Sequence, residues 1–172
     1  MMSNRALSRE TFMSENPLRR VALRALQRLQ HIGNRLVRPL TMGVRALVID
    51  ADNRVFLVRH SYLPGWHLPG GGVEPGETVR AALAHELAEE GNIVLEDEPV
   101  LFGLYFNSHA SERDHVALYV VRAFRQTAPR GANWEILETG FFPVDSLPAG
   151  ATRATRARIA EALGGGKAAE IW

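Results

Sequence analysis

The sequence contains no cysteine among its 172 residues. This absence excludes disulfide bonds, zinc sites built from thiolates and covalent catalysis by a thiol. It suits a reducing compartment, so we expect a cytoplasmic protein. The chain also lacks an apolar run long enough to span a bilayer, internal repeats, and the Gly-Lys-Ser/Thr motif of phosphate-binding loops. Its function therefore has to be sought in other residue patterns.

Length and composition are those of one globular domain with an extension. Hydrophobic residues make up 46% of the chain and charged residues 23%, which is ordinary for a globular protein with a single core. The charge is uneven along the chain. Residues 1–40 hold eight arginines and two glutamates, a net charge of +6, whereas the whole chain carries +1, which leaves −5 on residues 41–172. We therefore predict an N-terminal extension over residues 1–40 and a domain over residues 41–172.

The extension has the pattern of a basic amphipathic helix. Asn16 and Pro17 resemble an N-cap followed by proline in the first turn, and Pro39 ends the pattern. We expect the apolar stripe to pack on the domain or on a second subunit in a homodimer. Contact with an anionic membrane surface and contact of the arginines with RNA phosphates are two alternatives. The stripe recurs at three- and four-residue steps through Leu18, Ala22, Ala25, Leu29, Ile32 and Leu36.

A second predicted helix follows a glycine-rich turn at residues 70–72. Thr78 is a plausible N-cap, the next twelve residues are good helix formers, and Asn92 can adopt the left-handed conformation that ends a helix. On this helix Glu86 and Glu90 share a side with Val79 and Leu83, and the helical repeat places a further glutamate beside that stripe. The carboxylates therefore lie on or beside the apolar face.

Carboxylates on an apolar face repel one another and lose hydration, so they need a partner. The only cation of the helix, Arg80, lies on another side. A hard divalent cation with oxygen ligands would resolve the conflict. The alternative is a solvated acidic face, but such faces usually carry Lys or Arg four residues away, and this one does not.

The same segment resembles the signature of Nudix hydrolases. That signature is a Gly, five residues, a Glu, seven residues, and then Arg-Glu-aliphatic-x-Glu-Glu-x-Gly-aliphatic. The resemblance is specific over residues 66–93 and weaker over residues 41–147. The positions that match in register are Gly71, Glu77, Glu86, Leu87, Glu89, Glu90 and Ile93.

The resemblance implies a Nudix-type α/β/α sandwich with a mixed β-sheet, and one or more Mg²⁺ or Mn²⁺ ions at the signature. Carried over by position, the ligands are Glu86, Glu90 and the carbonyl of Gly71, with Glu89 as a further ligand or as the residue that activates water. Glu77 supports the site or binds a second metal ion. The implied reaction is hydrolysis of a phosphoanhydride in a nucleoside diphosphate linked to another group, with Glu86, Glu89 and Glu90 as the catalytic set.

Two positions depart from the signature. Asn92 replaces the last Gly, a mild change because Asn tolerates a positive φ. His85 replaces the Arg that orients the glutamates of the family, and an imidazole is shorter and offers fewer donors. We interpret His85 as a supporting residue of the site. The alternative is a non-catalytic nucleotide-binding module that retains the fold.

Strand patterns flank the signature. Residues 44–49 and 55–60 read as two strands of a hairpin with its turn at residues 50–54, and further strands are expected at 100–106, 115–124 and 135–142. A polar loop at 107–114 and a closing helix at 152–163 complete the pattern.

Several residues outside the signature are candidates for substrate contact. Arg45 and Arg59 could reach phosphates, although solvated strand ends are the alternative. Trp66 could stack on a base or pack in the core. Glu112, Glu135 and Glu138 are candidates for a further base, and the sequence does not choose among them.

Overall fold

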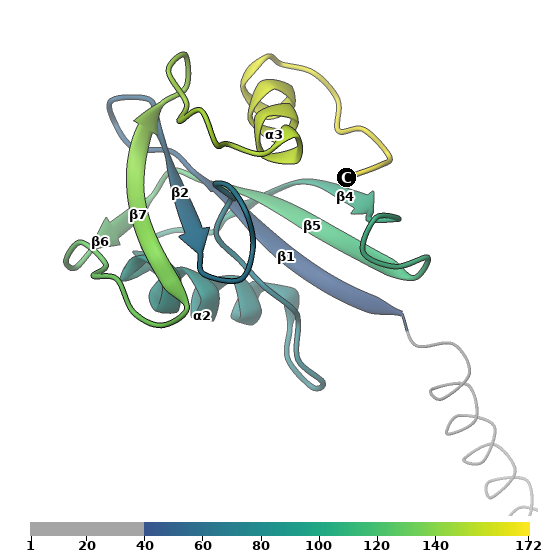
Figure 1. Ribbon diagram of the computed structural model, residues 1–172. Coiled ribbons are helices and arrows are strands. Elements are labelled where there is room, and N and C mark those ends of the chain that lie inside the picture. Colours follow the sequence, from purple (N-terminus) through teal and green to yellow (C-terminus); the bar gives the residue numbers. More distant parts are fainter. Residues whose placement is uncertain (1–39) are drawn as a thin grey trace, which may run out of the picture. The chain divides into compact units, whose positions relative to one another are not determined.

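Two helices lie on opposite sides of a layer of strands in the computed structural model, which describes residues 40–172 (Figure 1). The α/β layering expected from the sequence is therefore confirmed, whereas the predicted N-terminal helix lies outside the described residues. The elements in chain order are β1 (Thr41–Val48), β2 (Arg54–His60), α2 (Val79–Gly91), β3 (Ile93–Leu95), β4 (Val100–Phe106), β5 (Asp114–Val121), β6 (Phe124–Gln126), β7 (Ile136–Pro143) and α3 (Arg153–Leu163).

The strands form three small sheets, and the largest is mixed as predicted. Its order is β1-β5-β4, with β1 parallel to β5 and β4 antiparallel to β5. The other two sheets are the antiparallel pairs β2-β7 and β3-β6. β1 also has a neighbour on its free side, because residues 69–73 of the glycine-rich turn run antiparallel to it. That pairing fixes the turn against the sheet.

The hairpin predicted for residues 44–60 is wrong beyond its turn. The turn itself forms, since the Asp50 amide donates to the Arg54 carbonyl at 3.0 Å and the Asp50 carboxylate accepts from the Arg54 amide at 2.8 Å. The strands then pair only through a bridge between Ile49 and Val55. β1 continues beside β5 and β2 beside β7, so the two strands enter different sheets.

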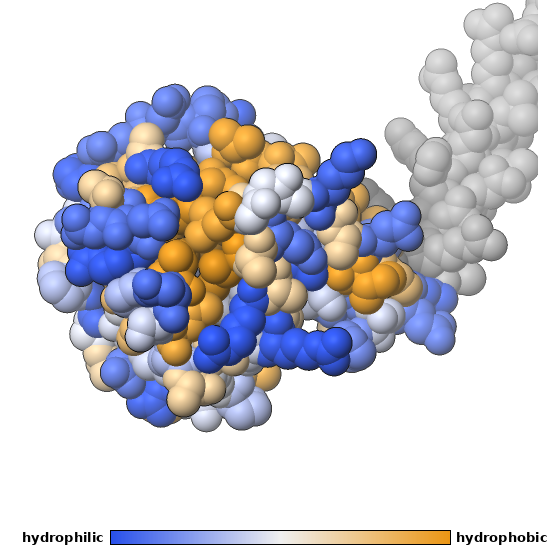
Figure 2. Space-filling model, turned by 90° about the horizontal axis from the view of Figure 1, so that it is seen from above, coloured by the Kyte–Doolittle hydropathy of each residue, from blue (hydrophilic) through white to orange (hydrophobic). Residues whose placement is uncertain are grey.

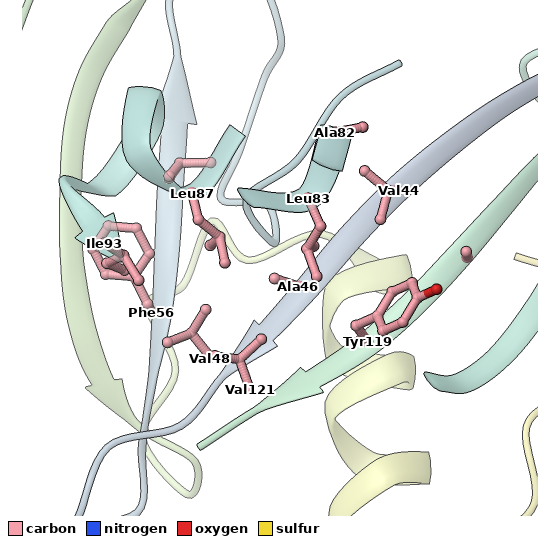
Figure 3. Close-up of a cluster of buried hydrophobic side chains, with 12 residues drawn as sticks. Val44, Ala46, Val48, Phe56, Ala82, Leu83, Leu87, Ile93, Tyr119 and Val121 are labelled. Atoms are coloured by element: carbon pink, nitrogen blue, oxygen red, sulfur yellow. The ribbon is translucent and has the colours of Figure 1, made fainter. Parts of the chain in front are cut away.

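The buried side chains form two clusters, one on each side of the strand layer. The first joins α2 to β1, β2 and β5, and Figure 3 shows Leu83 and Leu87 of α2 directed towards Ala46 and Val48 of β1. Burying such side chains contributes about 1.5–3 kcal/mol each. This cluster holds the predicted metal-binding helix against the sheet.

The second cluster lies under α3 and includes Trp66, Tyr105 and Ile159. The helix begins at its N-cap Thr152, whose hydroxyl accepts from the Thr155 amide at 3.1 Å. Several members of this cluster are only partly buried, and an apolar band is visible on the face seen from the α3 side (Figure 2). Neither α2 nor α3 has the length and apolar character that crossing a membrane requires.

Candidate active site

The helix that carries the glutamates begins and ends as predicted. The Thr78 hydroxyl accepts from the Ala81 amide at 3.1 Å, which caps the first turn of α2. Asn92 ends the helix with φ of 51° and donates its amide to the Ala88 carbonyl at 3.1 Å. The replacement of the signature's last Gly by Asn92 therefore leaves the helix end intact.

The glycine-rich turn is fixed to β1 by backbone hydrogen bonds. The Val44 amide donates to the Gly71 carbonyl at 2.9 Å, and the Val73 amide donates to the Met42 carbonyl at 2.8 Å. Gly70 has φ of +134°, and a Cβ there would lie 2.1 Å from the Val44 carbonyl oxygen. Only glycine fits this position, because it alone tolerates both the conformation and the close approach.

Glu90 is the deepest carboxylate of the site. Its residue is 6% exposed, one carboxylate oxygen accepts from the Gly70 amide at 2.7 Å, and the other lies 3.4 Å from Nε2 of the buried His60. Burial raises the pKa of Glu90 to about 8, although the Gly70 amide and the charge of Arg45 oppose the shift. A carboxylate in this position needs a positive partner in order to be ionised at neutral pH.

Glu86 lies one turn before Glu90 and reaches the same glycine-rich turn. A Cβ built on Gly71 would lie 2.0 Å from Oε1 of Glu86, so this carboxylate occupies the space beside Gly71 that a side chain would fill. Burial also raises the pKa of Glu86, and the charge of Arg45 again opposes the shift. Glu86 and Glu90 therefore lie on the buried side of α2, as the helical repeat predicted, whereas Glu89 is exposed.

The donors around the turn fit a hard divalent cation. Two carboxylates on successive turns of α2 lie against the backbone of Gly70 and Gly71, and carboxylate and carbonyl oxygens are the kind of ligand that Mg²⁺ and Mn²⁺ prefer. Within residues 40–172, no three His, Asp or Glu side chains converge on one point closely enough to hold an ion by themselves. Such a site would therefore need the Gly71 carbonyl as well as the side chains.

Glu77, just before α2, forms a pair with His85 on the second turn of that helix. Nδ1 of His85 lies 2.6 Å from Oε1 of Glu77, and the His85 side chain is 72% exposed. An imidazole at this position still reaches a glutamate of the signature. Arg80, by contrast, is turned away and pairs with Glu98.

Of the other residues singled out in the sequence, Arg59 contacts both Glu138 and Trp66. Arg59 pairs with Glu138 at 2.8 Å across β2 and β7, where both side chains are about half-exposed, and its guanidinium carbon lies 5.8 Å from the centroid of the Trp66 ring. Trp66 is 8% exposed and packs edge-on against Phe142, as the core alternative for this residue expects. Glu112 lies exposed in the loop at residues 107–114.

Glu135 is the one candidate base that shares a hollow with the acidic face of α2. The hollow has a volume of about 250 Å³ and lies between α2 and the loop that leads into β7. Its lining residues are Glu86, Glu89, Glu90, Arg130, Asn133, Trp134, Glu135 and Ile136.

Sequence reasoning missed Arg130, Asn133, Trp134 and the contact of His60 with Glu90. The available signal for the loop was one Trp between two strand patterns, in the otherwise small and polar stretch Gly131-Ala-Asn-Trp-Glu135. No local pattern indicates that His60 faces Glu90, because the two residues come from different elements.

Comparison with known proteins agrees with this arrangement. A family model of the NUDIX domain matches residues 39–163. The chain is 31% identical over 104 residues to an ADP-ribose pyrophosphatase of Methanocaldococcus jannaschii, an alignment that covers 59% of this chain and 61% of that protein. It is 38% identical over 65 residues to an RNA pyrophosphohydrolase of Dinoroseobacter shibae, covering 37% of this chain and 41% of that protein. The alignments thus span less than two thirds of either relative.

Solved structures show the same fold over a larger part of the chain. The crystal structure of a MutT NUDIX hydrolase from Burkholderia pseudomallei superposes with a TM-score of 0.61 at 28% identity, covering 71% of this chain and 97% of that one. A NUDIX hydrolase from Nitrosomonas europaea superposes with a TM-score of 0.62 at 20% identity, covering 74% and 91%. Since the family model matches more than half of the sequence, and Glu86 and Glu90 of the signature lie against the glycine-rich turn, the chain belongs to the Nudix family.

Proposed function

We propose that this protein hydrolyses a phosphoanhydride bond in a nucleoside diphosphate linked to another group, with Mg²⁺ or Mn²⁺ as cofactor. The observation that carries the proposal is the meeting of Glu86 and Glu90 at the backbone of Gly70 and Gly71. The names of the relatives, a pyrophosphatase and a pyrophosphohydrolase, support the same class of reaction. Hydrolysis means that water attacks one phosphorus atom and the bond from that phosphorus to the bridging oxygen breaks.

The residues that would hold the ion are Glu86, Glu90 and the Gly71 carbonyl, with Glu89 and Glu77 as further ligands or supports. When bound, such an ion neutralises charge on the diphosphate and makes water a better nucleophile. Glu90 is already fixed by the Gly70 amide, and His85 restrains Glu77. These contacts set the ligand geometry before substrate arrives.

Two further tasks fall to residues around the ligands. A carboxylate must accept the proton of the attacking water, and Glu89 and Glu135 both face the hollow beside α2. Arg45 is the cation whose charge acts on both Glu86 and Glu90, and it can bind a phosphate oxygen brought to the same place.

Substitution of Glu90 by Gln tests the proposal. Replacing the carboxylate by a carboxamide keeps the size of the side chain and an oxygen that accepts from the backbone N–H of Gly70, but it removes the charge. We expect Glu90→Gln to abolish release of phosphate or nucleoside monophosphate from a panel of nucleoside diphosphate derivatives in the presence of Mg²⁺, with the fold retained by circular dichroism. Glu98→Gln is the matched control, because Glu98 is exposed and pairs with Arg80 away from the turn.

A non-catalytic binding module is the second candidate, and the exposed His85 in place of the signature's Arg favours it. Tight nucleotide binding with no turnover by the unmutated protein would establish that alternative. Turnover that survives in Glu90→Gln would instead remove the assignment of the metal site.

A further inference from the structure

The indole side chain of Trp134 is exposed to solvent at the edge of the hollow that the glutamates of α2 line. Trp134 is 84% exposed, which makes it the most exposed of the large apolar side chains between residues 40 and 172. It also lines the hollow that contains Glu86, Glu89 and Glu90. An aromatic ring that lines a hollow instead of packing in the core is free to stack on a flat ligand.

The backbone around Trp134 is fixed, although the ring itself is free. The Asn133 side-chain oxygen accepts from the amides of Glu135 at 2.9 Å and Ile136 at 2.6 Å. The Ser61 amide donates to the Glu135 carbonyl at 2.8 Å, which ties this turn to the end of β2. A ring presented by a fixed backbone loses little conformational entropy when it binds a flat group.

The hollow that Trp134 lines also contains a cation. Arg130 lines the same space, and its Nε is buried without a hydrogen-bond partner among the described residues. A volume of about 250 Å³ is below the roughly 300–1,000 Å³ of pockets that enclose a whole drug-sized ligand. The space therefore suits one end of a substrate whose remainder extends over Glu86 and Glu89.

We infer that Trp134 and Arg130 form the nucleoside subsite of this protein, with a nucleobase stacked on the indole and the guanidinium bonded to the adjoining phosphate. The inference deepens the proposed function and rests on it for the position of the diphosphate. Stacking on an aromatic ring discriminates little among bases, because every base has a π-face. The protein should therefore require a base while accepting several different ones.

Paired substrates with and without a base test the subsite kinetically. ADP-ribose and UDP-glucose carry a base, whereas 5-phosphoribosyl diphosphate does not. Trp134→Ala should lower kcat/KM for the base-carrying substrates about 5- to 100-fold, mainly through KM, and this loss should be at least five times larger than the loss on the base-free substrate. Trp134→Phe should recover most of it. Leu104 is an exposed apolar residue on β4. The control variant Leu104→Ala should therefore leave kcat/KM unchanged for substrates with and without a base.

A binding measurement separates failure of the subsite from failure of the proposed reaction. The probe is α,β-methylene ADP, which is not hydrolysed. The signal is the tryptophan fluorescence of the wild type minus that of Trp134→Phe. This difference isolates Trp134 from the other two tryptophans. Quenching of this difference signal supports the subsite even if no substrate is turned over. An unquenched signal, or equal losses on substrates with and without a base, overturns it. A 5′-triphosphorylated RNA in place of the probe shows whether the base can belong to an RNA end.

Discussion

Glu90 is the residue at which burial and charge conflict most strongly. Its carboxylate is nearly enclosed, and its pKa is raised from the usual 4.5 to about 8. The folded protein without metal therefore retains a proton that the unfolded chain releases between these two values. The resulting stability is complete below pH 4.5 and is lost as the pH rises towards 8.

The Gln side chain of the variant Glu90→Gln does not titrate in this pH range, so comparing the variant with the wild type isolates the effect of the Glu90 carboxyl. In a chelator, the melting temperature of the variant minus that of the wild type should increase by several degrees between pH 4.5 and 8, since 1 kcal/mol moves the Tm of a domain by about 2–8 °C. Thermal melts at a series of pH values measure this difference. Excess Mg²⁺ should reduce it, because a cation favours the ionised Glu90. A difference that is constant with pH would contradict the raised pKa.

His85 offers a second prediction at the scale of one residue. Its contact with Glu77 lies at the surface, where ion pairs contribute about 0–1 kcal/mol to stability. Partners that orient metal ligands nevertheless typically change affinity or activity by about 10- to 100-fold. His85→Ala should therefore raise the Mg²⁺ concentration needed for half-maximal activity about tenfold and leave Tm nearly unchanged, while His85→Arg should keep the affinity. A large fall in Tm with unchanged Mg²⁺ dependence would make His85 a structural residue only.

Residue positions differ in how far the sequence could predict them. The burial of Glu86 and Glu90 followed from the helical repeat, because three- and four-residue spacing is a local property. The exposure of Trp134 did not, since a single aromatic residue in a loop has no periodicity. Trp66 also stands alone in a loop between strand patterns, and it is buried.

At the scale of elements, the glycine-rich turn contains one position that the fold requires and another that affects only the proposed metal site. Three successive glycines face different neighbours. A Cβ on Gly70 meets backbone atoms of β1, the three atoms nearest to one on Gly71 belong to the end of the Glu86 side chain, and one on Gly72 meets nothing within 4 Å. The backbone of β1 cannot move away from an added methyl group, whereas the flexible end of the Glu86 side chain can.

Alanine substitutions along this turn should therefore have three distinct results. Gly70→Ala should lower Tm sharply, because its φ of +134° and a contact of 2.1 Å are both unfavourable. Gly71→Ala should preserve Tm to within a few degrees but lower kcat/KM at least about 100-fold, since Glu86 must move. Gly72→Ala should resemble the wild type. Melting curves and initial rates for the three variants decide this, and a stable, active Gly70→Ala would refute the described packing.

The pairing of elements could be predicted less well than their existence. The sequence indicated strands close to each of β1, β2, β4, β5 and β7, because alternation and β-branched residues are local signals. It gave β1 the wrong partner, since the turn after Ile49 suggested a hairpin. The real partner, β5, begins at Asp114, and long-range packing decides that choice.

At the scale of the whole molecule, the described residues 40–172 bury one apolar cluster beneath each of the two helices α2 and α3. We predict that a chain of residues 40–172 contains a complete core for the domain. We expect this shortened chain to unfold in one cooperative transition and to retain kcat for a nucleotide substrate within about threefold, because no residue of the proposed site precedes Arg45. Calorimetry and steady-state rates provide the measurement.

The same truncation tests the proposed role of the basic extension. If the extension contacts a second subunit, light scattering should show a smaller particle after its removal. If it contacts anionic lipid or RNA, co-sedimentation with vesicles or a filter-binding assay should lose signal instead. Loss of cooperative unfolding in the shortened chain would show that the division of the chain at residue 40 is wrong.

The turn that carries Gly71 is also a strand neighbour of β1, and this dual role restricts how the protein can be regulated. The amide hydrogens of Val44 and Ala46 are bonded to the carbonyls of Gly71 and Pro69 at 2.9 Å each, so they can exchange with deuterium only when the turn detaches. Detachment would scatter the ligand oxygens and expose the edge of the largest sheet in one event. Inhibitors that detach this segment would consequently destabilise the protein, and slow exchange at two backbone positions would report an intact proposed metal site.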